Sequence, residues 1–273
     1  MNPSQLAINS VSTRQDSLPD LLDAYAAAGF ENVEFQLGAV HEYLDAGHDV
    51  DDVRSLLVER DLRCVGGFES TVSCFGGDPV EDNREIIENA RILSDLGAET
   101  MVVGTDGPDT GDEHGEDPDV VDACSEAFAA VARRVDLTLC LEFNWSPVVR
   151  SLRSATLVSR GSRRENVGVL FDPAHYHCTP TKFEDLTETT VAEIAHVHVD
   201  DMVDRPGDLS HPNDDRALPG EGHLDLDRLL GRVESAGYDG YFSIELFDDD
   251  LRAIPPEDAA RRMYESLEGL CEG

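Results

Sequence analysis

Lysine is almost absent from this chain of 273 residues, in which Lys182 is the only one. The 21 basic side chains are outnumbered by 57 acidic ones, which gives a formal net charge of −36 at pH 7. Nucleic acids and anionic membranes attract proteins through Lys and Arg side chains that neutralise phosphate groups. We therefore expect neither a nucleic acid nor a membrane as partner.

So large an acidic excess is typical of two kinds of chain. High net charge with low hydrophobicity marks intrinsic disorder, but regular apolar segments interrupt the acidic stretches of this chain. An acidic surface also suits concentrated salt, where screening suppresses the repulsion between like charges. We expect the second kind, a protein of a halophilic cytoplasm. Circular dichroism should then show a folded protein in molar KCl that loosens at low salt, and full stability in dilute buffer would contradict this expectation.

Long apolar runs and clustered cysteines are missing as well. No segment approaches the roughly 20 apolar residues that span a bilayer. The first residues, MNPSQLAINSVSTRQDS, lack the cationic start and the apolar stretch of a secretory signal. Without any CxxC spacing, the cysteines are expected to be buried thiols in a reducing compartment, the cytoplasm, rather than disulfides or a zinc cluster. They are Cys64, Cys74, Cys124, Cys140, Cys178 and Cys271.

The chain does contain a regular alternation of strand-like and helix-like segments. Strands are predicted at 6–10, 32–36, 63–68 and 99–104 and in the runs LTLCLEFN, VGVLFDPAHYH, IAHVHVDD and YFSIELF. Helices are predicted at 18–28, 50–60, 80–96, 120–134, 151–159, 183–192, 226–236 and 256–270. This alternation favours an α/β fold, a single (β/α)8 TIM barrel formed by one domain over residues 1–273.

A doubly wound open sheet is the alternative fold, because it also alternates strands and helices. It typically carries a GxGxxG phosphate-binding fingerprint after the first strand, and none is present here. The glycine pairs in GGF (66–68) and FGG (75–77) are interpreted as turn signals. The acidic segment 105–119 either lines the mouth of the barrel or is solvated surface, and we expect the latter.

Four successive strands in the second half of the chain end in potential metal ligands. They deliver Glu142, Asp172 with His175, His198 and Glu245. In a closed parallel barrel the carboxyl ends of the strands meet at one mouth. Carboxylate and imidazole ligands suit a single divalent ion, Mn²⁺, Mg²⁺, Co²⁺ or Zn²⁺, with positions left open for substrate. Alternatively, these side chains only cap or salt-bridge the strand ends.

In this order the strand ends resemble the xylose isomerase-like superfamily of TIM barrels, the sugar phosphate isomerase/epimerase family. The resemblance covers essentially the whole chain. It is carried by GFENVEF, LGAETMVVG, LEFN, FDPAHYH, HVHVDD, RALPGEGHLDL and GYDGYFSIEL. It implies one divalent metal ion held by Glu142, Asp172, His198 and Glu245, and a contact between His175 and substrate hydroxyls.

The resemblance also implies a substrate contact for Arg205, although a surface position is the alternative. Trp145 is expected either to face the C–H side of a sugar or to be ordinary core. His196 is expected to be a hydrogen-bonded histidine of the barrel interior. Glu34 either lines the mouth or pairs with a neighbouring base, and Arg216 meets either substrate or Glu221.

The chemistry implied is proton transfer at a carbon next to a carbonyl group. A metal ion that binds a ketone oxygen and its adjacent hydroxyl stabilises the enediolate left by proton removal. Glu142 and Glu245 would exchange that proton as base and acid. The expected enzyme is a metal-dependent isomerase or epimerase of a sugar, a sugar phosphate or a related hydroxy-ketone. Such a small carbohydrate-like molecule is the expected partner, and a homo-oligomer is common in the family.

Three other functions remain open. A lyase of the inosose or dehydroshikimate dehydratase kind would use the same metal site. An endonuclease IV-type phosphodiesterase would need a histidine-rich zinc cluster and a positive surface, which the charge of −36 opposes. A non-catalytic binding protein could retain the barrel. The stretch EFNWSPVVR also lacks the extra glutamate that several epimerases carry after the ligand of strand five, which weakens a specific ketose 3-epimerase assignment.

Overall fold

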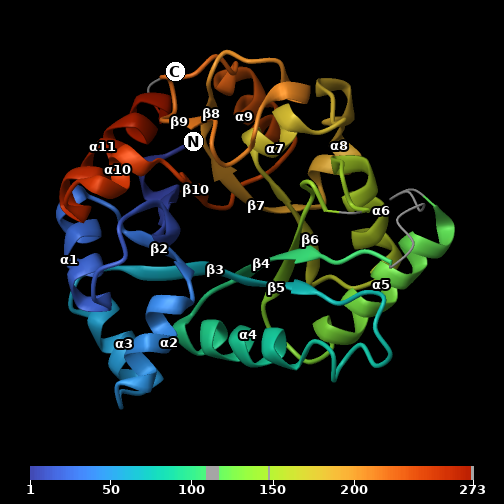
Figure 1. The fold of residues 1–273 in the computed structure, drawn as a ribbon, viewed down its shortest axis with the longest axis horizontal. Helices are drawn as coiled ribbons and strands as arrows, with labels where there is room; N and C mark the ends of the chain where they lie inside the picture. The colour runs from blue at the N-terminus through green and yellow to red at the C-terminus, as the bar shows by residue number, and fades with distance from the viewer. Residues whose placement is uncertain (109–116, 147, 272–273) are drawn as a thin grey trace.

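The computed structural model describes residues 1–108, 117–146 and 148–271, and for Glu69 the backbone alone. Eight parallel strands close into a barrel, and the helices form a ring around it (Figure 1). The barrel strands are β1 (Leu6–Asn9), β2 (Asn32–Gln36), β3 (Arg63–Val72), β4 (Thr100–Thr105), β5 (Thr138–Glu142), β6 (Val167–Phe171), β7 (Ile194–Val199) and β10 (Phe242–Ile244). Around the barrel they follow the order β1-β10-β7-β6-β5-β4-β3-β2. The predicted (β/α)8 TIM barrel is confirmed.

Eleven α-helices are found in the part of the chain that the structure describes. They are α1 (Leu18–Ala28), α2 (Gly38–Asp45), α3 (Val50–Val58), α4 (Arg84–Leu96), α5 (Pro118–Ala132), α6 (Leu152–Ser162), α7 (Pro173–Cys178), α8 (Glu188–Val191), α9 (Leu226–Ser235), α10 (Asp249–Ala253) and α11 (Pro256–Cys271). Helix α1 shows how the sequence sets such bounds. The Ser17 side chain accepts a hydrogen bond from the Asp20 N–H, and Gly29 ends the helix in the left-handed conformation, at φ 104°.

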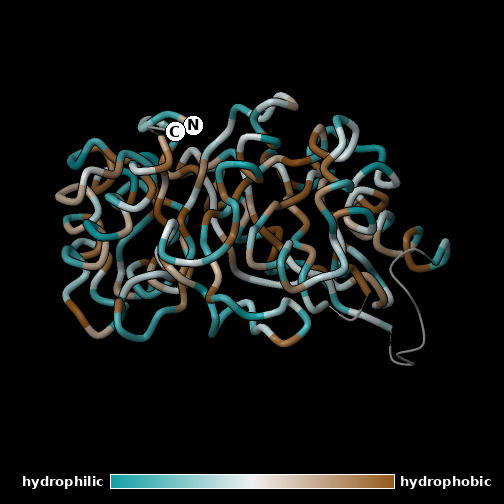
Figure 2. Tube along the Cα trace, turned by 90° about the horizontal axis from the view of Figure 1, so that it is seen from above, coloured by the Kyte–Doolittle hydropathy of each residue, from teal (hydrophilic) through white to brown (hydrophobic). Residues whose placement is uncertain are grey.

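The strands separate two layers of apolar packing. Residues such as Leu141 and Phe171 point outward and join the large core beneath the helices. Val102, Cys140 and Leu170 point inward and form a smaller cluster inside the barrel. Apolar side chains on both faces explain why the strands read as continuous apolar runs. Figure 2 shows the hydrophobic stretches among the inner segments, with hydrophilic stretches prevailing on the outer helices and loops.

The glycines of the GGF motif lie inside strand β3, so their interpretation as a turn signal was wrong. A Cβ atom at Gly66 would come within 2.8 Å of the Thr100 Oγ1, and one at Gly67 within 2.7 Å of the Leu93 Cδ2. Both distances are shorter than real Cβ contacts. A side chain at either position would force the Thr100 hydroxyl of strand β4 or the Leu93 methyl groups of helix α4 to shift, so glycine fits this close packing.

Other differences from the predicted elements lie in the connections. The helix predicted at 183–192 is a 3-10 turn, Phe183–Asp185, followed by the short helix α8. Helices α2, α7 and α10 were not predicted, and neither was the antiparallel pair of two-residue strands, β8 (Asp201–Met202) and β9 (Arg216–Ala217). All of these are too short to show a clear hydrophobic period.

The structure agrees with two expectations from the sequence, the one on membrane-spanning segments and the one on the cysteines. Among the described residues, no helix combines the length and the apolar character needed to cross a membrane. The structure shows no disulfide among the described residues, and four of the six cysteines are buried, as expected.

Candidate metal and active site

A cavity of about 500 Å³ opens at the carboxyl ends of the strands. Acidic, imidazole, guanidinium and amide groups line it together with three aromatic rings, the mixture of polar and apolar groups expected of a small-molecule site. The lining residues are Phe68, Glu142, Asn144, Trp145, Ser146, His175, Asn213, Arg216, Glu245 and Phe247. Four residues predicted from the sequence, Glu142, Trp145, His175 and Glu245, therefore border one cavity.

Three of the four predicted metal ligands come together at this mouth. Asp172, His198 and Glu245 each offer a ligand atom, and these atoms all lie within 4.8 Å of one another. The Nδ1 of His198 is 3.3 Å from the Glu245 Oε2 and 3.6 Å from the Asp172 Oδ2. That nitrogen is buried and has no hydrogen-bond partner. An imidazole nitrogen facing two carboxylate oxygens is a donor set that fits a divalent cation.

Local structure orients the two carboxylates. Asp172 caps the N-terminus of helix α7, where its Oδ1 accepts a hydrogen bond from the His175 backbone N–H at 2.9 Å. Its Oδ2 stays directed at His198. Glu245 follows strand β10, and its Oε1 accepts a hydrogen bond from the Asn9 side chain at 3.2 Å. In both side chains one oxygen is fixed by the scaffold and the other faces the site.

Glu142, the fourth predicted ligand, lies outside this group of three. Its Oε1 is 3.2 Å from the His175 Nε2, and the Asn144 side chain donates a hydrogen bond to its other oxygen. The same His175 nitrogen is 3.9 Å from the Asp172 Oδ2. Glu142 therefore adjoins the group through His175, and its role as a ligand stays a prediction, as does the contact of His175 with substrate.

Arg216 is the main residue whose position the sequence analysis missed. Its buried guanidinium donates to the Asp172 Oδ2 at 2.7 Å and to the Glu245 Oε2 at 2.6 Å, and its Nε lies 2.7 Å from the Asp200 Oδ2. The partners of Arg216 are thus Asp172, Asp200 and Glu245, and not Glu221, which the sequence analysis had considered. The strand pair β8 and β9 holds Arg216 opposite Met202. The guanidinium thus binds the same two carboxylate oxygens that face His198.

These contacts move the pKa values of the buried groups. Burial alone would raise the pKa values of Asp172 and Glu245. Arg216 and the neighbouring histidine side chains lower the pKa of Asp172, and His198 and Arg216 lower that of Glu245. Burial would lower the pKa of His198, but Glu245 and other acidic neighbours raise it well above its ordinary value. Burial and the nearby Asp172 raise the pKa of Asp200 well above its ordinary value.

Beneath the mouth, Glu34 is fully buried between two imidazoles. Its carboxylate lies 3.1 Å from the His198 Nε2 and 3.2 Å from the His196 Nε2. His196 also lies 3.5 Å from the Thr100 hydroxyl. Of the two positions considered for Glu34, the structure shows the one in which it pairs with neighbouring bases. The prediction of a hydrogen-bonded interior histidine matches the buried position and contacts of His196.

Arg205 lies away from the cavity. Its half-exposed guanidinium donates to both carboxylate oxygens of Asp215, at 2.9 and 2.7 Å. The alternative of a surface guanidinium fits this position better than the predicted substrate contact. Trp145 borders the cavity, is 46% exposed and lies against the His211 ring with 4.3 Å between ring centroids. Most of the acidic segment 105–119 lies outside the described residues.

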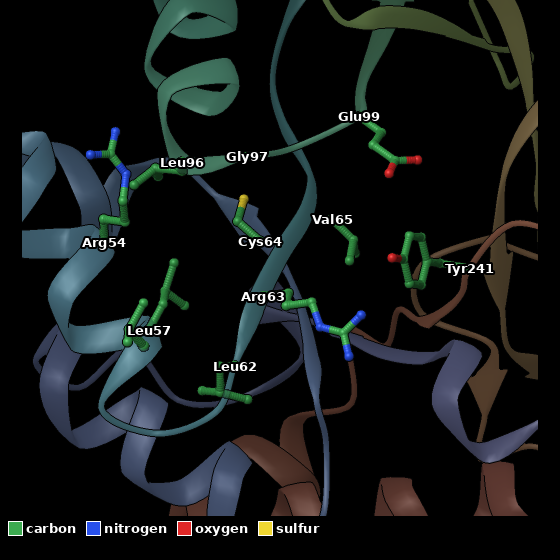
Figure 3. A pocket seen from close by; sticks show the side chains of 11 residues that line it. Arg54, Leu57, Leu62, Arg63, Cys64, Val65, Leu96, Gly97, Glu99 and Tyr241 are labelled. Atoms are coloured by element: carbon green, nitrogen blue, oxygen red, sulfur yellow. The ribbon is translucent and has the colours of Figure 1, made fainter.

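A second hollow, of about 330 Å³, lies at the opposite end of the barrel (Figure 3). Its walls come from the residues that begin or precede strands β3, β4 and β10, namely Arg63, Glu99 and Tyr241, and from helices α3 and α4. It contains neither a histidine nor a pair of facing carboxylates. Active sites of TIM barrels lie at the carboxyl ends of the strands, so the cavity beside Glu245 is the candidate site.

Comparison with known proteins identifies relatives of the whole fold. The family model described as xylose isomerase-like TIM barrel matches residues 22–270. Inosose isomerase from Halalkalibacterium halodurans is 30% identical over 137 residues, which are 49% of this chain and 48% of that protein. 3-dehydroshikimate dehydratase from Pseudomonas aeruginosa is 26% identical over 257 residues, 92% of this chain and 39% of that protein. The chain thus spans about half the length of the inosose isomerase.

Solved structures share the architecture at low sequence identity. The IolI protein, whose crystal structure has a binding zinc atom, superposes with a TM-score of 0.84 at 20% identity, and 97% of each chain is covered. This likeness supports the same barrel topology.

Proposed function

Because the chain belongs to the xylose isomerase-like TIM barrel family, we propose that it is a divalent-metal-dependent isomerase or epimerase. Its substrate would be a sugar, a sugar phosphate or a related hydroxy-ketone. The observation that carries this proposal is the group formed by Asp172, His198 and Glu245, with Glu245 opening onto the cavity that Glu142 also borders. A relative named inosose isomerase supports it.

Asp172, His198 and Glu245 would hold the metal ion, with Glu142 as the fourth ligand. A divalent cation bound there would supply positive charge beside a substrate carbonyl and so favour loss of a proton from the neighbouring carbon. The protein's own share of the chemistry is to orient the substrate and to move that proton. Asn144, Asn213 and other polar groups of the cavity offer hydrogen bonds to hydroxyls.

Glu142 and Glu245 are the proposed proton carriers. They follow different strands, β5 and β10, and both border the cavity. If they flank one carbon, one removes its proton and the other returns a proton to the opposite face, which gives an epimer. If one of them moves the proton between adjacent carbons, an aldose and a ketose interconvert.

The charge of the cavity favours an uncharged substrate over a phosphorylated one. Arg216 is the one guanidinium among the described lining residues, and three carboxyl groups already surround it. A phosphate group would therefore meet little free positive charge, and the acidic side chains around it would repel it. Within the proposed substrate range, we accordingly favour a neutral polyhydroxy ketone.

A lyase that uses the same site is the second candidate. The match to the relative named 3-dehydroshikimate dehydratase covers 92% of this chain and 39% of that protein. Loss of a hydroxyl group after proton removal would need the same metal ligands and the same base. Fold and ligand set therefore do not distinguish dehydration from isomerisation.

Deuterium exchange tests the proposal. The protein with Mn²⁺ is incubated with a panel of ketoses and inososes in D₂O at high salt, and products are followed by NMR and mass spectrometry. We expect deuterium at one C–H position without loss of water, and no exchange in a chelator-treated control. Loss of water would identify the lyase. Absence of any exchange in protein shown to bind the metal would contradict both candidates.

A further inference from the structure

A buried carboxylate from one side of the barrel reaches the predicted histidine ligand on the other. Glu34 belongs to strand β2 and His198 to strand β7, and these strands are separated by β1 and β10 in the barrel order. Both Glu34 oxygens lie 3.1 Å from the His198 Nε2. The other ring nitrogen, Nδ1, faces Asp172 and Glu245. His198 thus lies between the interior acid and the acids of the mouth.

The scaffold leaves room for this arrangement at Gly66. In the strand register Gly66 is paired with Glu34, and a Cβ atom there would lie 3.6 Å from the Glu34 Cγ and 2.8 Å from the Thr100 Oγ1. A side chain at this position would therefore displace the Thr100 hydroxyl, which contacts His196. His196 and His198 point to the same side of strand β7 because they are two residues apart.

We propose that Glu34 is a positioning residue for His198: it accepts the hydrogen on Nε2 and leaves the Nδ1 lone pair directed at Asp172 and Glu245. This inference rests on the proposed metal-dependent function. A neutral imidazole carries one N–H group and one lone pair, and an ionised carboxylate can only accept. Glu34 therefore decides which ring nitrogen remains available to a cation. Carboxylate partners of this kind fix the tautomer and the orientation of metal-binding histidines.

Two other roles for Glu34 fit the structure less well. It is fully buried and does not line the cavity, so it is not placed to exchange protons with substrate. The Glu34, His196 and His198 group has the composition of a second cation site. However, the His198 Nε2 lies 3.1 Å from both Glu34 oxygens, an N–H···O hydrogen-bond distance that a proton on this nitrogen satisfies. The His196 Nε2, 3.2 Å from the Glu34 Oε2, makes no hydrogen bond to the described residues.

The test compares Glu34→Gln with Glu221→Gln. Both variants replace a carboxylate with an amide of the same shape, one buried beside His198 and the other exposed in a turn. The Gln amide is uncharged and carries a donor NH₂ group, so it is a weaker acceptor for the His198 Nε2 hydrogen than the carboxylate. We expect Mn²⁺ affinity, measured by competition with a chelator, to fall on the order of 10–100-fold in Glu34→Gln alone. Glu34→Asp, which keeps a carboxylate, should recover part of this loss.

A second measurement does not depend on the metal. Imidazole ¹⁵N chemical shifts of the metal-free protein, recorded at a pH at which the His198 ring is neutral, should show its single proton on Nε2 in the wild type. In Glu34→Gln that proton should be lost from Nε2 or shared with Nδ1. Circular dichroism checks that each variant is folded.

Three results would overturn the inference. The first is wild-type Mn²⁺ affinity in a folded Glu34→Gln protein. The second is a wild-type His198 that carries its proton on Nδ1 alone. The third is two Mn²⁺ ions per wild-type chain and one in the variant, because Glu34 would then be a ligand. In contrast, a wild type that binds Mn²⁺ but exchanges no substrate deuterium, with weakened binding in Glu34→Gln, would contradict the proposed activity and support this inference.

Discussion

Replacing Glu245 with Gln should nearly abolish turnover and leave the fold intact. Glu245 borders the cavity, and its Oε2 lies 3.3 Å from the His198 Nδ1. An amide cannot take up a proton from substrate, and it offers a metal ion no charged ligand. Loss of a general base costs roughly 10²–10⁴-fold in rate. We therefore expect the deuterium-exchange rate to fall by at least about 10²-fold.

Glu221→Gln again serves as the matched control, because that side chain is exposed and lies outside the cavity. It should retain the wild-type exchange rate. Circular dichroism of Glu245→Gln should match that of the wild type, since the amide keeps the shape of the side chain and one acceptor oxygen for Arg216. A folded Glu245→Gln protein with an undiminished rate would rule out Glu245 as the base.

Replacing Arg216 with Met should strongly destabilise the metal-free protein. The buried guanidinium donates to Asp172 and Glu245, and its loss leaves two buried carboxylates without that partner. Removal of one member of a buried ion pair costs about 3–5 kcal/mol. Urea unfolding should show a loss of this size, and addition of Mn²⁺ should restore part of it, because the metal ion replaces the missing positive charge.

Arg205→Met is the control for the general effect of losing a guanidinium. Arg205 pairs with Asp215 and is half-exposed, and exposed ion pairs contribute roughly 0–1 kcal/mol. Its loss should therefore cost no more than about 1 kcal/mol. Equal losses in both variants would contradict the account of Arg216.

The pH dependence of the Arg216→Met variant follows from the pKa values. In the wild type the folded pKa values of Asp172 and Glu245 are lowered, so their contribution to stability is present above the ordinary carboxyl range and is lost as pH falls through the folded values. Without Arg216 these pKa values should be higher than in the wild type, because only the neighbouring histidines then oppose the effect of burial. At a given pH the folded variant then binds more protons than the folded wild type, so its stability deficit should grow as pH rises through the range in which these carboxyl groups ionise.

The sequence predicts those site residues whose position is set by a strand end. Asp172, His198 and Glu245 each follow or end an apolar run, and barrel closure alone brings such ends together. Glu142 satisfies the same pattern but pairs with His175. That pairing depends on the side-chain rotamers of two residues, which a strand pattern does not determine.

Contacts formed by the connecting segments could not be predicted in the same way. Arg216 reaches Asp172 because residues 201–217 fold back through a two-residue strand pair, and strands this short give no periodic signal. The partner of Glu34 was undecided because strands β2 and β7 are not neighbours. Gly66 was taken for a turn because a single sequence does not show that Thr100 occupies the space beside it.

The central claim is that one divalent cation binds where Asp172, His198 and Glu245 converge. Anomalous diffraction from crystals grown with Mn²⁺ at high salt tests it most directly. We predict one strong anomalous peak per chain, bounded by the Asp172 Oδ2, the His198 Nδ1 and the Glu245 Oε2. Saturated crystals in which this position holds no peak, with Mn²⁺ bound only to acidic groups on the surface, would contradict the account.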